Sequence, residues 1–324
     1  MPATERSPTV SVIIPAYNTA AYIRETLDSV FRQPCPDYEA IVINDGSPDT
    51  EELERALEPY RDRIVYINQE NRGPGGARNT GIRAARGRYV AFLDSDDFWE
   101  PDYLAAQLAV LEADVTVDVV YPDAIYFGDT TDNGRRFMEL TPSEGEVTFE
   151  SLVTQTCNVM VSVLARRDTV VRAGMFDESF KASEDFDLWL RIVKQGGRIA
   201  YNRRVLVHYR RRQGCLASDP VRMCAAIVSV LDKIEKVLPL TPREREILSR
   251  ERTRFRAGLR LSRGKRAFLR GDRTTAIEEL TAANAFFRSR KITLVLWLLR
   301  LAPGLLSRAY DLRDTLILGR NTKF

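Results

Sequence analysis

The clearest chemical signal in the chain is a run of three carboxylates in one short turn. Asp94, Asp96 and Asp97 follow the apolar residues Phe92 and Leu93, which are typical of the end of a buried strand. Like charges held this close repel one another, and a divalent cation is the simplest compensation. Mg²⁺ is usually held by only one or two carboxylates together with substrate phosphates, and Mn²⁺ takes similar oxygen ligands. The turn therefore predicts a divalent metal site and a phosphorylated substrate.

A purely structural role is the alternative for the same residues. Asp is a preferred N-cap residue, and Pro is favoured in the first turn of a helix. Asp96 or Asp97 would then cap a helix that Pro101 opens. Short acidic motifs often match by chance, so both interpretations stay open on this motif alone.

Two further polar motifs also follow apolar runs. Residues 15–18 (Pro-Ala-Tyr-Asn) come after one run, and residues 44–47 (Asn-Asp-Gly-Ser) come after the next. Apolar runs alternate with helical patterns to about residue 127, which predicts βαβ units: an α/β fold with a Rossmann-type, mostly parallel sheet flanked by helices. Ligands of such sheets bind at the carboxyl ends of the strands, so the three polar motifs should share one edge. The predicted strands are 9–14, 40–43, 64–67 and 89–93, and the predicted helices are 22–31, 51–60, 77–86 and 103–111.

The pattern changes twice further along the chain. Residues 128–183 are rich in turn residues and predict loops and edge strands; a helix over 184–195, ended by two glycines, and strands at 199–201 and 205–209 follow. Beyond about Cys215 the pattern is wholly helical and includes one helical hairpin over 256–287. We expect a catalytic domain over 1–215, with halves at about 9–127 and 128–215, and an all-helical C-terminal region over 216–324.

Composition and charge set the wider bounds. The 324 residues are 44% hydrophobic, enough for a sizeable core. Net charge is +3, but residues 250–324 hold 18 Lys and Arg against 6 Asp and Glu, so this tail carries +12 and predicts an anionic neighbour. The four cysteines lack metal-site spacing and are expected to be reduced thiols. No apolar signal region precedes the first strand, and the longest apolar run, 292–299, is far below the ~20 residues of a membrane-spanning helix, so we expect a cytoplasmic protein.

The order of five motifs carries a family resemblance. They occupy residues 15–18, 44–47, 71–79 (Asn-Arg-Gly-Pro-Gly-Gly-Ala-Arg-Asn), 93–97 and 183–188 (Ser-Glu-Asp-Phe-Asp-Leu). In this order the chain resembles a family 2 glycosyltransferase, inverting and of the GT-A type, over residues 9 to about 212. The resemblance implies a GT-A-like fold and sugar transfer from a nucleotide-diphospho-sugar donor.

The resemblance also assigns a donor pocket. Asp45 would accept a hydrogen bond from the base ring, next to Tyr17, although Asp45-Gly46 also favours a simple turn. The family usually has two Asp here and this chain has Asn44 first, which can still cap the turn. The candidate nucleotide-sugar-binding residues are Pro15, Ala16, Tyr17, Asn18, Asp45, Arg78, Asp94 and Ser95.

A glycine-rich stretch precedes one of these residues. Gly73–Gly76 would present backbone N–H groups and a helix N-terminus to phosphate, or would form only a flexible loop before the helix. Arg78 suits phosphate oxygens by its guanidinium group, although an exposed helical Arg is the ordinary alternative.

The resemblance assigns the metal and the base. Asp96 would be the direct metal ligand, for Mn²⁺ or Mg²⁺, with Asp94 nearer the ribose. Asp185 would be the general base that takes the proton of the acceptor hydroxyl, a role worth about 10²–10⁴ in rate; capping of a helix by Ser183 or Asp185 is compatible with it. Further candidates for the site are Asp97, Glu184, Trp189, Arg210 and Arg212.

One departure concerns the only histidine. Relatives place a His near position 212, whereas this chain has Arg there and its His at position 208. We therefore read His208 as a strand residue satisfied locally, and Arg210 and Arg212 as groups that could contact phosphate directly. Arginines that contact phosphate would replace part of the positive charge of a metal ion, so this departure argues against a strict dependence on metal.

The basic tail suggests where the protein works. Residues 292–299 (Ile-Thr-Leu-Val-Leu-Trp-Leu-Leu), flanked by basic residues, have the composition of a helix that lies on an anionic membrane surface. Packing on the catalytic domain or on a second subunit is the alternative. No recognition motif supports nucleic-acid binding. We expect a peripheral location at the inner face of the cell membrane.

Together these features predict transfer of a single sugar, from a UDP-sugar, to a hydroxyl of a glycan or lipid-linked acceptor in cell-surface polysaccharide synthesis. The Gln-x-x-Arg-Trp element and membrane helices of processive relatives do not occur. One alternative is a sugar-nucleotide nucleotidyltransferase, but residues 13–20 lack its basic glycine-rich loop. The other is a non-catalytic helical-repeat adaptor with a degenerate sugar-nucleotide fold.

Overall fold

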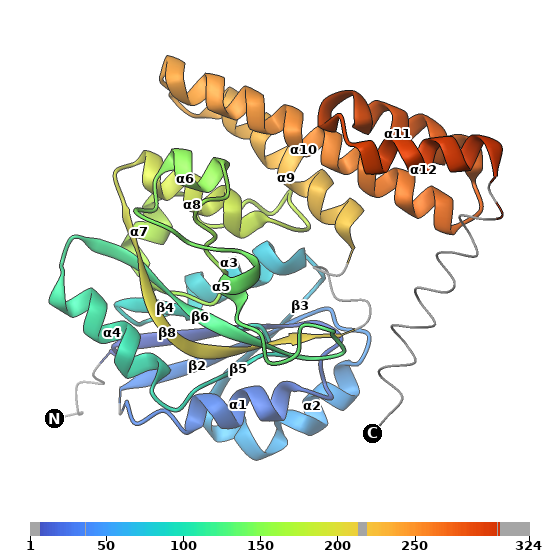
Figure 1. Cartoon of the computed structure of the whole chain (residues 1–324). Helices are drawn as coiled ribbons and strands as arrows, with labels where there is room; N and C mark the ends of the chain where they lie inside the picture. The colour runs from blue at the N-terminus through green and yellow to red at the C-terminus, as the bar shows by residue number, and fades with distance from the viewer. Residues whose placement is uncertain (1–6, 36, 213–218, 303, 305–324) are drawn as a thin grey trace, which may run out of the picture. The chain divides into compact units, whose positions relative to one another are not determined.

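The computed structural model describes residues 7–35, 37–212, 219–302 and 304 (Figure 1). Contacts divide the chain into two compact units. Unit 1 comprises Met1–Asp219 and Ser229–Leu248, and unit 2 comprises Pro220–Val228 and Ser249–Phe324. The domain boundary that the sequence places at residue 215 lies outside the described residues and stays a prediction.

Unit 1 is built on one mixed sheet of eight strands. Their order across the sheet is β3-β2-β1-β4-β7-β6-β8-β5. The strands are β1 (Val10–Ala16), β2 (Tyr38–Asp45), β3 (Ile64–Gln69), β4 (Tyr89–Phe92), β5 (Phe98–Trp99), β6 (Val117–Gly128), β7 (Leu164–Arg166) and β8 (Arg198–Arg211).

Strand direction separates the two halves of the sheet. Strands β1 to β4 pair in parallel, as predicted, and β6 pairs in parallel with β8. Strand β7 runs antiparallel to both of its neighbours, β4 and β6, and β5 runs antiparallel to β8. The α/β fold is therefore confirmed. The expectation of only loops and edge strands in 128–183 is wrong, because β7 is an inner strand that joins the two halves.

Helices cover both faces of this sheet. Helices α1 (Ile23–Phe31) and α2 (Thr50–Leu57) lie on one face, and α3 (Gly73–Ala84) and α8 (Glu184–Lys194) lie on the other (Figure 1). Strands β1, β2 and β4 between them are largely buried, as apolar runs covered on both sides must be, whereas the edge strand β3 is partly exposed. Gly81 allows α3 close to the sheet: a Cβ atom there would lie 2.4 Å from Cγ2 of Ile13.

The remaining elements of unit 1 connect or cover these layers. They are the 3₁₀ helix η1 (Glu58–Arg63), α4 (Tyr103–Ala113), α5 (Phe137–Leu140), α6 (Phe149–Val153) and α7 (Arg167–Arg172). Helix α4 begins at Tyr103 with Asp102 at its N-cap, and β5 separates it from the acidic turn. The capping interpretation of Asp96 and Asp97 is therefore wrong.

Two predicted boundaries also move. Helix α3 begins at Gly73 rather than Ala77, so the glycine-rich stretch forms its first turn and is no free loop. The two strands expected at 199–201 and 205–209 form one continuous strand, β8, whose pairing with β6 has three register shifts. Bulges of this kind let a long strand continue past turn-forming residues.

Helices dominate the C-terminal part, as expected. They are α9 (Pro220–Val237), α10 (Pro242–Leu269), α11 (Arg273–Phe287) and α12 (Arg290–Leu301). Helices α9 and α10 have residues in both units. In unit 2, α10, α11 and α12 share a small apolar core, and Gly264 permits a close crossing because its Cβ would lie 2.7 Å from Cγ of Leu280. The core residues are Ala267, Ala276, Leu280, Leu296 and Leu299. Cys35, Cys157 and Cys224 are free thiols.

Candidate active site

The polar motifs share the carboxyl edge of the sheet, as the βαβ pattern predicts. The end of β1 pairs with the end of β2 through Ala16 and Asn44, and Ile13 of β1 pairs with Phe92 of β4. The turn that follows β4 is thus carried next to the residues that follow β1. This register is set by the buried apolar faces of three neighbouring strands.

The first motif offers backbone and an exposed ring. Tyr17 is 49% exposed, and Asn18 is exposed with a φ of 53°. The backbone N–H of Asn18 donates to Oγ of Ser47 at 2.6 Å, which joins the first motif to the second. Pro15 is half-buried and Ala16 is fully buried, so the Ala16 side chain presents nothing to a ligand. A flat exposed ring is suited to stack on a base.

Asp45 has a structural role that the sequence did not indicate. Its carboxylate is 3% exposed and accepts from Nε2 of Gln69 at 2.7 Å and from the backbone N–H groups of Arg72 and Gly73, both at 2.8 Å. It therefore stabilises the N-terminus of α3. The N–H group of Gly73, expected to face phosphate, is committed to Asp45.

Asn44 fills the first position of the second motif. Its Oδ1 accepts from the N–H of Ser47 at 2.9 Å, and its Nδ2 donates to the hydroxyls of Thr50 and Tyr66. An amide can donate and accept at once, whereas a carboxylate could only accept. Asn44, which departs from the family pattern, thus closes the turn over residues 44–47. This turn contains Gly46, whose φ is +62°.

Arg78 links two parts of the chain that are far apart in sequence. Its side chain is 4% exposed; Nη2 pairs with Oδ1 of Asp94 at 2.6 Å and Nη1 pairs with Oε1 of Glu184 at 2.5 Å. Burial opposes the charged form, but Asp94 and Glu184 together raise the pKa of Arg78 above its usual value. The guanidinium is therefore committed to two carboxylates. It joins the acidic turn to α8.

The acidic turn is held from β8. Nε of Arg212 donates to Oδ2 of Asp96 at 2.7 Å, and the backbone N–H of Arg210 donates to Oδ1 of Asp97 at 2.7 Å. The guanidinium of Arg210 also donates to the backbone oxygen of Asp96. Burial and the neighbouring carboxylates raise the pKa of Asp96 and raise that of Asp97 well above its usual range. Repulsion within the turn is thus real even with both arginines present.

Hydroxyl groups under the turn were missed by sequence reasoning. Oγ1 of Thr26, on α1, donates to the backbone oxygens of Ser95 at 3.0 Å and of Asp97 at 2.7 Å. Oγ of Ser95 is buried and pairs with Oγ1 of Thr19 at 2.8 Å, so the Ser95 side chain fixes the turn. A Thr in an amphipathic helix carries no sequence signal for this role.

Asp185 lies at the start of α8 and has an unusual acidity. Burial and the adjacent Glu184 raise its pKa to about 7, against the lowering effect of Arg78. Ser183 precedes it in the left-handed region, with a φ of 58°, and its side chain makes no capping hydrogen bond. Ser183 thus occupies the N-cap position, as one of the two capping alternatives has it, but without a side-chain capping hydrogen bond. A carboxyl that titrates near neutral pH is suited to general-base catalysis.

The other acidic residues of α8 are neutralised. Glu184 pairs with Arg78, and Asp187, fully buried, pairs with Arg191 at 2.7 Å and with Nζ of Lys233 at 2.7 Å. Lys233 also pairs with Asp177 at 2.7 Å. It comes from α9, outside the part of the chain that the motifs covered, and sequence reasoning missed it.

Trp189 belongs to the core. Its side chain is 1% exposed, and its indole N–H has no hydrogen-bond partner in the described part of the chain. A role in an acceptor pocket is therefore not supported by its position. Large aromatic side chains on the inner face of a helix are commonly core residues.

The acidic turn fits a divalent cation that phosphate oxygens also hold. Among the described residues, no group of three or more His, Cys, Asp and Glu side chains is arranged so that it could hold a metal ion by itself. Asp96 keeps a partly exposed side chain, 17%, and Asp94 has 29%. One or two carboxylates that repel each other are the usual protein share of a Mg²⁺ or Mn²⁺ site completed by substrate phosphates.

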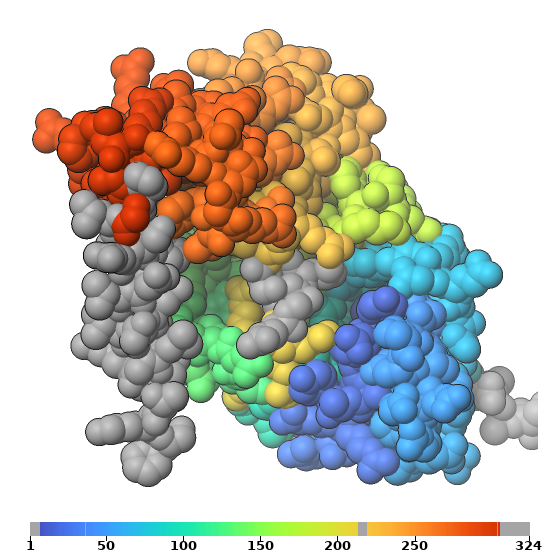
Figure 2. All heavy atoms as spheres, turned by 90° about the vertical axis from the view of Figure 1, so that its right-hand side faces the viewer, coloured from blue at the N-terminus to red at the C-terminus, as the bar shows by residue number. Residues whose placement is uncertain are grey.

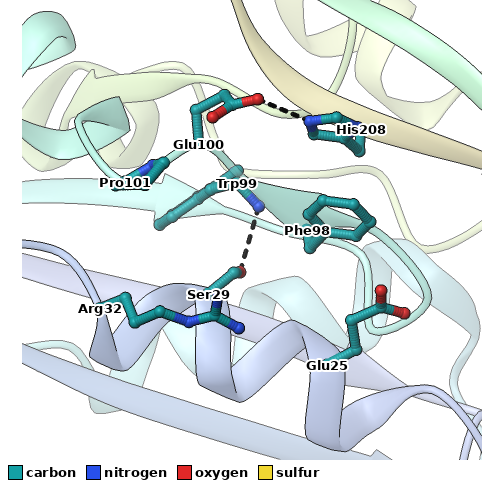
Figure 3. A pocket seen from close by; sticks show the side chains of 8 residues that line it. All are labelled: Glu25, Ser29, Arg32, Phe98, Trp99, Glu100, Pro101 and His208. Atoms are coloured by element: carbon teal, nitrogen blue, oxygen red, sulfur yellow. Dashed lines mark hydrogen bonds and ion pairs between the residues drawn. The ribbon is translucent and has the colours of Figure 1, made fainter. Parts of the chain in front are cut away.

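His208 is a strand residue held by local contacts, as the sequence indicated. Its Nε2 pairs with Oε1 of Glu100 at 2.7 Å, and its ring stacks on Phe98 with centroids 4.2 Å apart. Figure 3 shows His208 beside Glu100 and Phe98 in a small cavity between α1 and β5. The volume of this cavity is about 260 Å³. His208 is thus satisfied locally. The residues lining the cavity are Glu25, Ser29, Arg32, Phe98, Trp99, Glu100, Pro101 and His208.

Solved structures of similar shape define the fold of the chain. Staphylococcus aureus TarS, residues 1–349 in complex with UDP-GlcNAc, superposes with a TM-score of 0.62 at 19% identity and covers 86% of this chain and 91% of that one. The mannosyltransferase PcManGT of Pyrobaculum calidifontis, in complex with GDP-Man and Mn²⁺, has a TM-score of 0.61 at 21% identity and covers 95% and 88%. At such identities the likeness shows the fold, which is of the GT-A type.

Sequence comparison then shows the family. The model of Glycosyl transferase family 2 matches residues 11–178, about half of the chain, and the chain belongs to this family. The matched part contains the acidic turn and ends before Asp185. The family resemblance seen in the motifs is therefore confirmed, and the role of Asp185 stays a prediction.

Curated relatives give the same picture. A glycosyltransferase of Rickettsia prowazekii, described as uncharacterized, is 32% identical over 211 residues, which are 63% of this chain and 64% of that one. Another, from Rickettsia bellii, is 31% identical over 214 residues, 63% of this chain and 30% of its own length. The chain thus spans less than two thirds of the length of these relatives.

Proposed function

We propose that the protein is an inverting glycosyltransferase that moves a single sugar from a nucleotide-diphospho-sugar to a hydroxyl of a glycan or lipid-linked acceptor, in cell-surface polysaccharide synthesis. The observation that carries the proposal is one linked set of side chains. The buried Arg78 pairs with Asp94 of the acidic turn and with Glu184, whose neighbour in the chain, Asp185, has a pKa of about 7. A phosphate-binding turn and a general base are the two parts that such a transfer needs.

The donor is proposed to be a UDP-sugar. TarS is solved with UDP and with UDP-GlcNAc, and PcManGT with GDP-Man, so two nucleotides occur on this fold. Support for donor binding comes from the exposed ring of Tyr17 and the backbone of Pro15 and Asn18 at the carboxyl edge of the sheet. Asp45 has accepted three hydrogen bonds from the protein, which leaves about one of a carboxylate's four acceptor positions for a base N–H.

The chemical step requires a base on the acceptor side. The carboxylate of Asp185 takes the proton of the acceptor hydroxyl as its oxygen bonds to the anomeric carbon. The bond from that carbon to the diphosphate breaks, the diphosphate leaves with the electron pair, and the configuration inverts. Glu184 and Asp187 cannot replace Asp185, because both are buried and paired with cations. The pKa of Asp185 lies near that of an efficient base at neutral pH.

Asp96, with Asp94 beside it, would hold a Mn²⁺ or Mg²⁺ ion. When bound, such an ion neutralises negative charge on the departing diphosphate. Arg212 stands at the carboxylate that would bind the ion, so its guanidinium must move aside or turn to the phosphates when the donor binds. Either position adds positive charge at the leaving group.

The same site argues against the two alternatives. A degenerate adaptor would have no reason to keep a buried carboxyl with a pKa of about 7, since burying a group that ionises is costly. A nucleotidyltransferase would need a basic loop after β1. There the structure has Tyr17, Asn18 and Thr19.

A ligand screen tests the donor. Ligands selective for the folded state raise its apparent stability, so thermal shifts with UDP-, GDP- and dTDP-sugars, with and without Mn²⁺, rank the donors. We expect the largest shift for a UDP-sugar with Mn²⁺, and loss of the Mn²⁺-dependent part in Asp96→Asn. The control is Asp62→Asn, an exposed carboxylate on η1. No shift for any nucleotide sugar in the unmutated protein would refute the proposed donor class.

A further inference from the structure

Helix α12 has two apolar faces, and only one of them is packed. Ile292, Val295, Leu296 and Leu299 are spaced three and four residues apart, so they form one stripe on the helix. Leu296 and Leu299 are buried against α10 and α11 at 7% and 1% exposure, with Ile292 and Val295 packed beside them. This stripe accounts for the folding of α12 onto unit 2.

The second stripe is exposed. Leu294, Trp297, Leu298 and Leu301 repeat at the same spacing on another side of the helix. Leu294 is 57% exposed, Trp297 56% and Leu301 66%, and Leu298 is half-buried. Atoms of α12, drawn in red in Figure 2, lie at the molecular surface. Large apolar side chains gathered along an exposed helix face mark an interaction surface.

The charge around this stripe has one sign. Residues 280–302 contain four basic residues, Arg288, Arg290, Lys291 and Arg300, and no Asp or Glu. All four are exposed, and two of them lie in the first turn of α12. Apolar side chains including Trp, bordered by basic residues, are the features that place a helix in the headgroup region of an anionic bilayer.

The length of α12 fixes the geometry of such binding. The helix has 12 residues, and no helix among the described residues is long and apolar enough to cross a membrane. A bilayer core needs ~20 apolar residues. Helix α12 would therefore lie in the plane of the surface with one face in the lipid and the other on the unit 2 core.

We propose that the exposed face of α12, formed by Leu294, Trp297, Leu298 and Leu301, docks the protein on an anionic lipid surface. The inference deepens the proposed peripheral location and rests on the proposed function for its purpose, which is to hold the enzyme where a lipid-linked acceptor lies. The binding itself needs no donor or acceptor. Its test therefore stands apart from any test of sugar transfer.

The chain contains a built-in probe of this face. It has three tryptophans, of which Trp99 and Trp189 are buried at 3% and 1% exposure, whereas Trp297 is exposed. A change in fluorescence that depends on solvent quenching therefore reports mainly on α12. Insertion of Trp297 into lipid shifts its emission to the blue and protects it from iodide.

The experiment uses the full chain with two kinds of vesicle. One kind is phosphatidylcholine alone, and the other is phosphatidylcholine and phosphatidylserine in equal amounts. We expect co-sedimentation, a blue shift and loss of iodide quenching with the anionic vesicles, weakened by high salt. Binding to neutral vesicles is expected to be at least tenfold weaker, because several basic residues contribute near an anionic surface.

Two variants separate apolar from electrostatic contributions. Leu294→Ser with Leu301→Ser should weaken binding to anionic vesicles by about tenfold or more. Arg290→Gln with Lys291→Gln should weaken it by about tenfold as well and make it less sensitive to salt. The matched control is Val115→Ser, which removes a side chain that is 77% exposed in unit 1 and should change nothing. Circular dichroism and the nucleotide-sugar thermal shift check that each variant is folded.

Three outcomes overturn the proposal. The first is an unmutated, folded protein that does not bind anionic vesicles. The second is a Trp297 that iodide does not quench in the free monomer, which would show that another segment of the chain covers the face. The third is protection of Trp297 that appears with protein concentration and without lipid, together with a dimer in sedimentation, which would assign the face to a second copy. Failure of donor binding with intact vesicle binding would count against the proposed function alone.

Discussion

Two acidic clusters meet at Arg78 and are treated differently by the fold. In the turn after β4, Asp96 pairs with Arg212 and Asp97 accepts from the backbone of Arg210. At the start of α8, Glu184 takes Arg78 and Asp187 takes Arg191 and Lys233. Asp185 forms no ion pair with the described residues, and its pKa is raised to about 7 by burial and by Glu184, against the lowering effect of Arg78.

The difference assigns a different task to each cluster. In the turn, burial and neighbouring carboxylates raise the pKa of Asp96 and Asp97 even beside Arg210 and Arg212, so this cluster is suited to take further positive charge that arrives with a donor. The carboxyl of Asp185, which accepts from the backbone N–H of Phe186 at 2.8 Å, has a pKa of about 7 and so changes protonation near neutral pH. We therefore propose that the first cluster binds the donor and that the second moves one proton.

The largest expected effect comes from removing that proton acceptor. Asp185→Asn should lower the rate of sugar transfer by about 10²–10⁴, the usual contribution of a general base. Nucleotide-sugar binding should stay within about twofold, because Asp185 belongs to the second cluster. Product formation over time measures the rate of transfer, and the thermal shift with nucleotide sugar measures binding. Asp62→Asn serves as the control, and a fully active Asp185→Asn would remove the distinction between the clusters.

The link between the clusters is the next target. Arg78→Met leaves Asp94 and Glu184 without their buried partner and should destabilise the protein by about 3–5 kcal/mol, because uncompensated buried charge is costly. Urea unfolding measures the change. The control is Arg83→Met on the same helix, whose side chain is 50% exposed and whose removal should cost less than about 1 kcal/mol. Equal destabilisation by both variants would show that the two ion pairs of the buried Arg78 contribute no more to stability than the ion pair of an exposed arginine.

Lys233 offers a smaller test of the second cluster. Lys233→Met leaves Asp187 with Arg191 alone and removes the ion pair to Asp177, whose pKa is lowered to about 2, despite burial, by hydrogen bonds from Lys233 and Ser179. We expect a loss of about 1–3 kcal/mol in unfolding free energy, as for hydrogen bonds to charged groups. Lys236→Met, exposed on the same helix, is the control. Donor binding in the first cluster should be unaffected, and a selective loss of donor binding would contradict the separation.

Much of the first half of the fold could be predicted from the sequence. Strands buried on both faces read as apolar runs, so β1 to β4 were found along with their helices and the shared carboxyl edge. Strand β7 could not be found, because it has only three residues and its Arg166 looks polar. That side chain is satisfied by the backbone oxygens of Val117 and Leu111, a partnership that no local pattern encodes.

The site was predictable in its residue types and less so in its pairings. The acidic turn and Asp185 followed from motifs, but Arg78 was expected at phosphate and instead bridges Asp94 and Glu184. Which cation meets which carboxylate depends on contacts between residues far apart in sequence. Thr26 and Lys233 were missed for the same reason, since each lies in a helix whose pattern reports only its buried face.

The smallest expected effect is the most specific to the comparison. Because the base must be unprotonated, the rate of transfer should rise with pH through an apparent pKa of about 7, by about tenfold from pH 6 to pH 8. The negative charge of Glu184 raises the pKa of Asp185, so Glu184→Gln should move the profile to lower pH. Asp97→Asn removes a carboxylate from the first cluster. It should leave the midpoint of the pH profile unchanged, since the pKa of Asp185 is set by burial, Glu184, Arg78, the Phe186 backbone and Asp94. A pH profile of kcat at saturating donor makes the measurement. If Asp97→Asn moves the midpoint and Glu184→Gln does not, the group that titrates lies in the turn after β4. The general base would then belong to the first cluster rather than to the second.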